Sequence, residues 1–269
     1  MALSPTMNVM LRAAEKAARS LIRDFGEVEQ LQVSRKGPGD FVSAADHRAE
    51  EIIHGELSKA RPDYAFLMEE SGAVGDKNAE YCWIIDPLDG TSNFLHGVPH
   101  WCISIGLEHN KEIIAGVVYD PVRDEMFRAE KGTGAFMRNK RLRVSGRALL
   151  DSAMIATGQP ARDHRESDQF MGEYHAVLKN CAGIRRFGAA ALDLSYVAAG
   201  RYEGFWERGL KAWDMAAGYL IIKEAGGIAT TIDDRKMPVH EGNIIAGNDQ
   251  LFEPLRKLVK DAGQKKDAA

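Results

Sequence analysis

The stretch that decides the fold is Trp83-Ile84-Ile85-Asp86-Pro87-Leu88-Asp89-Gly90-Thr91-Ser92-Asn93-Phe94, an apolar strand that runs into two acids, a glycine and a hydroxyl residue. Pro87 fixes one backbone dihedral and stiffens the turn between the acids. Gly90 lets the backbone approach a ligand closely. The N–H groups that follow are typical of a helix N-terminus, which binds phosphate. Asp86 and Asp89 would repel a phosphate, and divalent cations between them would remove that repulsion.

The same segment also suits a plain turn, because Asp-Pro-x-Asp-Gly is good turn chemistry and the first Asp can bond its own backbone. Three other acids favour a site. Glu69 ends an apolar run, Asp46 starts a helix, and Asp214 follows Trp213 at another helix start. Each alone is typical of a helix cap or a solvated turn. Together they fall at the ends of elements, where α/β folds place their sites.

The first half of the chain, about residues 1–145, predicts two helices followed by an antiparallel meander. Apolar residues at three- and four-residue steps predict a helix over 7–25 that stops at Gly26, and a second helix from near Ser43. Between them we expect a strand at 31–34 and a loop at 35–40. Short apolar runs bounded by turns predict the strands of the meander: 64–68, 81–85, 102–107, 113–119 and 126–129.

The second half, about residues 146–262, alternates helices with strands, which favours a layered α/β arrangement. The expected strands are 153–157, 184–187, 204–207, 228–232 and 244–246. The expected helices are 163–179, 189–198, 213–225 and a last one before the tail. Residues 263–269 form a polar tail that we expect to fray. Since we find no linker and no repeat, residues 1–269 are predicted to be a single domain.

Composition excludes several classes of protein. Hydrophobic residues make up 45% and charged residues 28%, a globular balance, and the formal net charge of −4 gives no general attraction for nucleic acid. The basic run at 138–147 lacks interleaved aromatic residues, so a solvated hairpin face is favoured over a nucleic-acid surface. No apolar run approaches the roughly 20 residues that span a membrane. The odd set Cys82, Cys102 and Cys181 predicts reduced thiols and a cytoplasmic protein.

Two long motifs resemble the inositol monophosphatase family, a branch of the magnesium-dependent, lithium-sensitive sugar phosphatases. The first is residues 83–96, and the second runs from Trp213-Asp214-Met215 to Gly227. Residues 36–46 and Glu69-Glu70-Ser71-Gly72 match two further family blocks, and the similarity covers about residues 7–260. It implies an α/β (mixed α+β) fold with an α-β-α-β-α layered sandwich, a homodimer, and a phosphoric monoester hydrolase.

The resemblance also implies a Mg²⁺ site of two or three ions, with Mn²⁺ as a possible substitute. Glu69, Asp86 and the Leu88 carbonyl would hold the first ion. Asp86, Asp89 and Asp214 would hold the second, and Glu69 would also face a third, more hydrated ion. Independently of the family, an oxygen-only, carboxylate-rich set favours these hard cations over zinc.

For catalysis, the resemblance places Thr91 between Asp46 and the attacking water, with Asp46 accepting the threonine proton. The amides of Gly90 and Thr91 would hold the phosphate. Metal-bound water ionises near neutrality, and Glu69 together with the Asp46–Thr91 pair can take or orient its proton. No covalent phosphoenzyme is required.

The substrate contacts carry alternatives. Glu207 matches a family glutamate that binds sugar hydroxyls, or it is a surface acid at a strand end. Gly188 and Ala190 match the block that lines the polyol, with a backbone bond from Ala190. Ala189 stands where the family commonly has Ser or Thr, which puts a polyol contact there in doubt. Lys36 either approaches the metal site or is solvated.

The leading hypothesis is a Mg²⁺-dependent phosphatase that converts inositol monophosphate to inositol and phosphate. The first alternative keeps this chemistry with fructose 1,6-bisphosphate, histidinol phosphate or a 3′-phosphonucleotide as substrate. The second alternative is a regulatory protein of a nucleic-acid or transcription machine, with incidental hydrolysis. Its only support is the basic run at 138–147.

Overall fold

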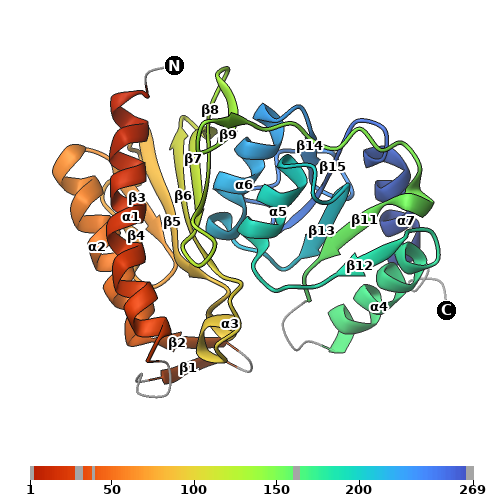
Figure 1. Cartoon of the computed structure of the whole chain (residues 1–269), viewed down its shortest axis with the longest axis horizontal. Helices are drawn as coiled ribbons and strands as arrows, with labels where there is room; N and C mark the ends of the chain where they lie inside the picture. Colours follow the sequence, from red (N-terminus) through yellow and green to blue (C-terminus); the bar gives the residue numbers. More distant parts are fainter. Residues whose placement is uncertain (1–2, 28–32, 38–39, 160–163, 265–269) are drawn as a thin grey trace.

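The computed structural model describes residues 3–27, 33–37, 40–159 and 164–264, and it arranges them in alternating layers of helix and sheet (Figure 1). In order, the layers are α1 (Pro5–Phe25) with α2 (Ala44–Ala60), an eight-stranded sheet, α5 (Ala190–Ala198) with α6 (Ala212–Glu224), a five-stranded sheet, and α4 (His164–Leu178) with α7 (Phe252–Gln264). The predicted α-β-α-β-α sandwich is therefore confirmed.

The first sheet has the order β10-β9-β8-β7-β6-β5-β3-β4. Its strands are β3 (Ala65–Met68), β4 (Gly72–Val74), β5 (Tyr81–Asp89), β6 (Cys102–His109), β7 (Glu112–Asp120), β8 (Glu125–Glu130), β9 (Gly134–Met137) and β10 (Lys140–Arg141). From β5 to β8 the pairing is antiparallel, as predicted, and β9 and β10 continue the antiparallel pairing beyond the predicted strands. However, β3 and β5 are parallel, with Met68 opposite Ile85. Parallel pairing places the residues after both strands at one edge of the sheet.

Strand β5 runs four residues further than predicted, through Pro87 to Asp89. Proline has no N–H for a strand ladder, and the register between β5 and β6 shifts between Asp86 and Asp89, which accommodates it. The short helix α3 (Thr91–Leu95) follows at once, with Gly90 as its N-cap. The two acids therefore lie at the end of a central strand, next to a helix start.

The expected loop at 35–40 is wrong, because β1 (Val33–Gly37) pairs antiparallel with β2 (Asp40–Ser43). The two strands are consecutive in the chain, and their pairing satisfies backbone groups that a loop would leave to water. Residues 31–32 of the expected strand lie outside the described residues.

The second sheet has the order β12-β11-β13-β15-β14. Its strands are β11 (Met154–Thr157), β12 (Gly183–Arg185), β13 (Gly204–Arg208), β14 (Ile228–Thr230) and β15 (Asn243–Gly247), with the 3-10 turn η2 (Leu150–Ser152) before them. The predicted alternation is confirmed, with bounds that differ by a few residues. Helix α7 extends to Gln264, into the expected tail, and residues 265–269 lie outside the described residues.

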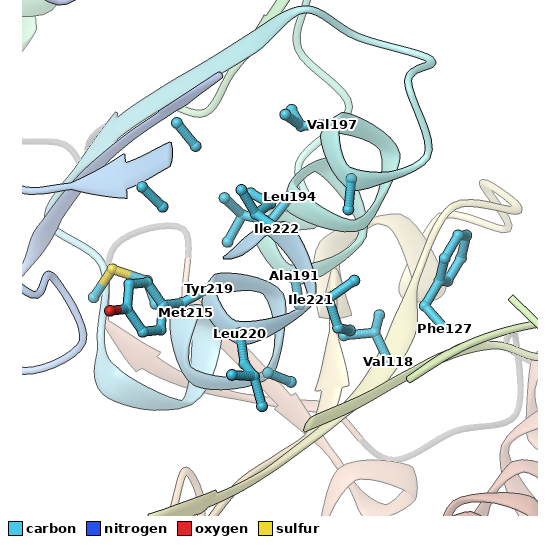
Figure 2. Close-up of a cluster of buried hydrophobic side chains, with 14 of the residues drawn as sticks. Val118, Phe127, Ala191, Leu194, Val197, Met215, Tyr219, Leu220, Ile221 and Ile222 are labelled. Atoms are coloured by element: carbon cyan, nitrogen blue, oxygen red, sulfur yellow. The ribbon is translucent and has the colours of Figure 1, made fainter. Parts of the chain in front are cut away.

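Helix α6 lies very close to the first sheet because two strands carry glycine where it crosses. A Cβ added to Gly106 would lie 2.8 Å from the Ala216 Cβ, and one added to Gly116 would lie 2.9 Å from the Ala217 Cα. Around this contact, α5, α6 and the first sheet share one buried apolar cluster (Figure 2), which includes Val118, Phe127, Leu194, Val197, Ile221 and Ile222. The middle helices are thus fixed firmly against the sheet.

None of the helices in the described ranges is both long and apolar enough to cross a lipid bilayer. The three cysteines are free thiols, as predicted. Cys102 is fully buried in β6, and burial raises its pKa well above the usual value, so the thiol is un-ionised.

Candidate active site

Parallel pairing of β3 with β5 brings Glu69 and Asp86 together. The Glu69 N–H donates to the Ile85 carbonyl oxygen at 3.2 Å, so Glu69 continues the ladder beside the residue that precedes Asp86. Asp86 is 2% exposed, and its Oδ1 accepts the Leu88 N–H at 2.9 Å, which closes the turn around Pro87. Two acids from different strands thus share one edge of the sheet.

Helix α6 brings the third acid, Asp214, to the same place. Ser104 lies opposite Asp86 in β6, and its hydroxyl donates to the Trp213 carbonyl oxygen at 3.0 Å. This bond holds the first turn of α6 beside Asp86. The Asp214 Oδ2 accepts the Lys211 N–H at 2.6 Å, as acids in the first turn of a helix commonly do.

The fourth acid, Asp89, connects the first sheet to α5. Its Oδ1 accepts the Ala190 N–H at 3.2 Å and its Oδ2 accepts the Ala191 N–H at 2.7 Å. Two amides at the start of α5 therefore grip a carboxylate that belongs to β5. The Asp89 Oδ2 also accepts the Cys102 thiol at 3.6 Å. Because a carboxylate has about four lone-pair positions, Asp89 keeps acceptor capacity beyond these three bonds.

The four carboxylates act strongly on one another. Burial raises the pKa of Asp86 well above its usual value, and the charges of Glu69, Asp89 and Asp214 raise it further. Burial raises the pKa of Asp89 to about 6 and, with the charge of Asp89, that of Asp214 to about 7. Like charges at low dielectric are costly, and divalent cations are the natural complement of such a set.

In the described part of the chain, no three Asp, Glu, His or Cys side chains are already gathered as a ready-made metal site. Asp89 and Asp214 each turn an oxygen toward backbone N–H groups. The donor chemistry nevertheless fits Mg²⁺ or Mn²⁺, because these side chains supply only oxygen and cluster closely enough to raise one another's pKa. The assignment of Glu69, Asp86, Leu88, Asp89 and Asp214 as ligands stays a prediction.

Thr91 and Asp46 are in contact, as predicted. The Thr91 Oγ1 lies 3.1 Å from the Asp46 Oδ1 and 3.0 Å from the Leu88 carbonyl oxygen, so its hydroxyl hydrogen can be donated to either. Asp46 is fully buried in the first turn of α2. Gly90 has φ +95°, a backbone conformation that favours glycine, and a Cβ there would lie 3.1 Å from the His100 carbonyl oxygen.

Glu207, at the end of β13, reaches the same cluster from the second sheet. Burial raises the pKa of Glu207 well above its usual value, and the charges of Asp214, Asp193 and Asp89 add to the rise. A Cβ on Gly158 would lie 1.8 Å from the Glu207 carboxyl carbon, so only glycine at 158 leaves room for this carboxylate. Burial of its carboxylate argues against a solvated surface acid, and a contact from Glu207 to substrate stays a prediction.

The loop before α5 lies over the first-sheet turn. Asn93 of α3 donates to two carbonyl oxygens, that of His100 at 2.8 Å and that of Phe187 at 2.7 Å, and thereby places Gly188 next to the Asp89–Gly90 turn. Ala189 is fully buried, 3.3 Å from where a Gly90 Cβ would lie. Its methyl group is therefore packed against the turn.

Two of the predicted substrate contacts remain open. The Ala190 N–H, which we expected to face a polyol, donates to Asp89 in this structure, so a contact from Ala190 to substrate stays a prediction. The backbone of Lys36 lies in β1, and its side chain lies outside the described residues.

Sequence reasoning missed several residues around the site. Asn93 lies within residues 83–94, the stretch that decides the fold. A side-chain amide next to a glycine turn can donate hydrogen bonds to backbone carbonyl groups of neighbouring segments, and this signal could have marked it. Glu50 is 2% exposed and one helical turn after Asp46, a spacing that could have marked it. His100 and Asp193 are also buried, with the His100 Nε2 4.0 Å from the Asp193 Oδ1, and burial lowers the pKa of His100 to about 4. No local pattern marks that pair.

Comparison with known proteins places this chain in a family. The sequence model of the inositol monophosphatase family matches residues 2–264. The chain is 54% identical to an inositol-1-monophosphatase of Mesorhizobium japonicum, over 97% of this chain and 98% of that protein. It is 43% identical to the Nus factor SuhB of Pseudomonas aeruginosa, over 96% and 97% of the two chains. The crystal structure of the extragenic suppressor protein suhB of Bartonella henselae matches with a TM-score of 0.92 and 52% identity, over 96% and 99%. The chain therefore belongs to the inositol monophosphatase family.

Proposed function

We propose that this phosphatase hydrolyses inositol monophosphate to inositol and inorganic phosphate, with Mg²⁺ bound by the acid cluster, and that it works as a cytoplasmic homodimer. The observation that carries the proposal is the cluster itself: the end of β5 supplies Asp86 and Asp89, the turn after β3 supplies Glu69 and the start of α6 supplies Asp214, and the charges of the other three acids raise the pKa of Asp86. Glu207 at the edge of this cluster is suited to bind hydroxyl groups of a polyol.

In this proposal Glu69, Asp86, the Leu88 carbonyl, Asp89 and Asp214 hold the cations. Bound Mg²⁺ supplies charge neutralisation for the phosphate and a lower pKa for a coordinated water. Phosphate monoesters hydrolyse extremely slowly in water, so both contributions are needed.

The protein's own groups then orient the reaction. Thr91 holds the attacking water through its hydroxyl oxygen while it donates to Asp46, and Asp46 keeps that orientation because it is buried and fixed on α2. Glu69 would accept the proton of the water. The amides of Gly90 and Thr91, at the N-terminus of α3, bind the phosphate oxygens. In-line attack and departure of the inositol hydroxyl complete the reaction without a covalent intermediate.

A phosphate-release assay tests this proposal. The purified chain is given inositol 1-phosphate, fructose 1,6-bisphosphate, histidinol phosphate and a 3′-phosphonucleotide, each with Mg²⁺ and with EDTA. We expect Mg²⁺-dependent release that is fastest from inositol 1-phosphate and inhibited by lithium. A strong preference for another substrate would keep the chemistry and overturn the substrate. Release that persists in EDTA would overturn the role of the cation. Light scattering after size exclusion tests the homodimer.

A second candidate function is a regulatory role in a nucleic-acid or transcription machine. It is suggested by relatives that are named Nus factors, such as that of Pseudomonas aeruginosa at 43% identity. Such a role needs a free surface. In the basic run, Arg138 forms an ion pair with Asp124 and Arg147 forms one with Glu203. Two of its positive charges are therefore neutralised by acids of the same chain. The test is charge reversal at Arg141 and Arg143. If cells that carry this variant show the same transcription phenotype as cells with the wild-type protein, the basic run no longer supports the regulatory role.

A further inference from the structure

Glu50 is a buried acid that the mechanism above does not use. It is 2% exposed on α2, one turn after Asp46. Its Oε2 accepts the Glu70 N–H at 2.8 Å, and its Oε1 accepts the Ser71 N–H at 2.9 Å and the Ser71 hydroxyl. All three donors belong to the turn between β3 and β4, where Met68 lies opposite Gly72. The carboxylate therefore grips the turn that follows Glu69.

The consequence concerns the backbone of Glu69. On one side, the Glu69 N–H is bound by the Ile85 carbonyl oxygen of β5. On the other side, the next two N–H groups along the chain are bound by Glu50. Consecutive bonds to two different elements leave the Glu69 peptide little freedom, so its side chain starts from a fixed Cα and a fixed direction. A half-exposed turn without Glu50 would exchange these bonds with water.

The arrangement also ties two parts of the site to one helix. Asp46 and Glu50 are four residues apart, so they share one face of α2. Asp46 contacts Thr91, while Glu50 holds the turn after Glu69. Burying two carboxylates on one helix face is costly unless each is hydrogen-bonded. Asp46 and Glu50 each accept hydrogen bonds in the site, and these bonds offset the free-energy cost of burying the two carboxylates.

We propose that Glu50 is a positioning residue, which fixes the turn 69–71 so that Glu69 faces the cation site in register with Asp86. This inference rests on the proposed function, in which Glu69 is a cation ligand. In this role Glu50 acts through the turn and not by contact with substrate or cation. Groups that orient metal ligands commonly change metal affinity or activity by about 10–100-fold when they are removed.

The test compares Glu50→Gln with Glu51→Gln, which neutralises the next residue, an exposed glutamate on the same helix. Mn²⁺ binding is measured directly from the loss of the free-ion EPR signal, and phosphate release from inositol 1-phosphate is measured over a Mn²⁺ titration. For Glu50→Gln we expect Mn²⁺ affinity to fall by about 10-fold and the activating Mn²⁺ concentration to rise in parallel. The KM for substrate at saturating Mn²⁺ should stay unchanged, and Glu51→Gln should match the wild type throughout.

A second variant, Ser71→Ala, removes only the hydroxyl donor and keeps both N–H bonds to Glu50, so it decides the matter if Glu50→Gln does not fold. We expect a smaller loss of Mn²⁺ affinity, with an unchanged circular dichroism spectrum. Folded variants that bind Mn²⁺ as tightly as the wild type would overturn the positioning role, even if their melting temperatures fall. A wild-type protein that neither binds Mn²⁺ nor releases phosphate would instead overturn the proposed function.

Discussion

Replacement of Gly116 by alanine tests whether the close packing of α6 on the first sheet sets the position of Asp214. The added Cβ would lie 2.9 Å from both the Cα and the carbonyl oxygen of Ala217, and those are backbone atoms that no rotamer change can move. Carbon atoms in contact lie about 3.5–4.0 Å apart. Helix α6 would therefore have to retreat by roughly 0.5–1 Å.

Two effects follow from that retreat. Overpacking of this kind costs about 1–3 kcal/mol. This exceeds the roughly 0.4–1 kcal/mol that alanine returns by restricting the unfolded chain. For a domain of this size each kcal/mol lowers the melting temperature by about 2–4 °C. Asp214 lies one turn before Ala217, so it moves with the helix, and a misplacement near 1 Å can reduce turnover by about 100-fold.

The assay is thermal unfolding by circular dichroism together with phosphate release at saturating Mg²⁺ and substrate. Gly55→Ala is the matched control, since Gly55 lies in α2 with nothing within 4 Å of an added Cβ. That control should keep its activity and gain about 0.5–1 kcal/mol. If Gly116→Ala melts at the wild-type temperature and turns over at the wild-type rate, the tight helix–sheet contact does not position Asp214.

The remaining predictions address the site directly. Asp86→Asn should reduce phosphate release by more than about 100-fold and weaken Mn²⁺ binding, because one carboxylate would serve two ions; retained turnover would contradict the assignment. Thr91→Ala should lower turnover by about 100-fold or more with Mn²⁺ affinity preserved, as expected for a group that orients the water, and a loss confined to Mn²⁺ affinity would argue against that role. Gly158→Ala should raise the KM for inositol 1-phosphate by about 10-fold, since its Cβ would overlap the Glu207 carboxyl group and displace the hydrogen bond that we propose it makes to the substrate; an unchanged KM would separate Glu207 from substrate. Because the pKa of Asp214 rises from 3.8 to about 7 on folding, the folded protein keeps a proton that the unfolded chain has lost, and stability in EDTA should fall as the pH rises through that interval. Melting temperatures near about pH 5 and about pH 8 check this sign, and Asp214→Asn should flatten the difference.

Local sequence patterns were enough to predict most of the order of helices and strands. They also pointed to all four acids of the cluster, Glu69, Asp86, Asp89 and Asp214. Glu69 and Asp86 were visible because an apolar run ends abruptly in an acid, and Asp214 because it follows Trp213 at the start of a helix. Such signals depend on a few neighbouring residues, which is why they survive without knowledge of the fold.

Pairing and side-chain direction were beyond the reach of local patterns. The parallel register of Met68 with Ile85 depends on strands that a linear pattern does not relate, and an antiparallel meander was the simpler expectation. The methyl group of Ala189 packs against Gly90 across two layers, which its own neighbours do not indicate. The grip of Glu50 on a turn some twenty residues away belongs to the same class.

The bond between Asp89 and the first amides of α5 has a consequence for how such chains can be recombined. Asp89 belongs to the first half of the sequence, and Ala190 and Ala191 belong to the second. These hydrogen bonds therefore need residues from both halves. In a chimaera that joins the first half of one relative to the second half of another, the carboxylate and the two amides of these bonds come from different proteins. We expect such a hybrid to keep these two hydrogen bonds when α5 begins at the same distance from the first sheet in both relatives, whereas exchanges within either half leave the bonds intact.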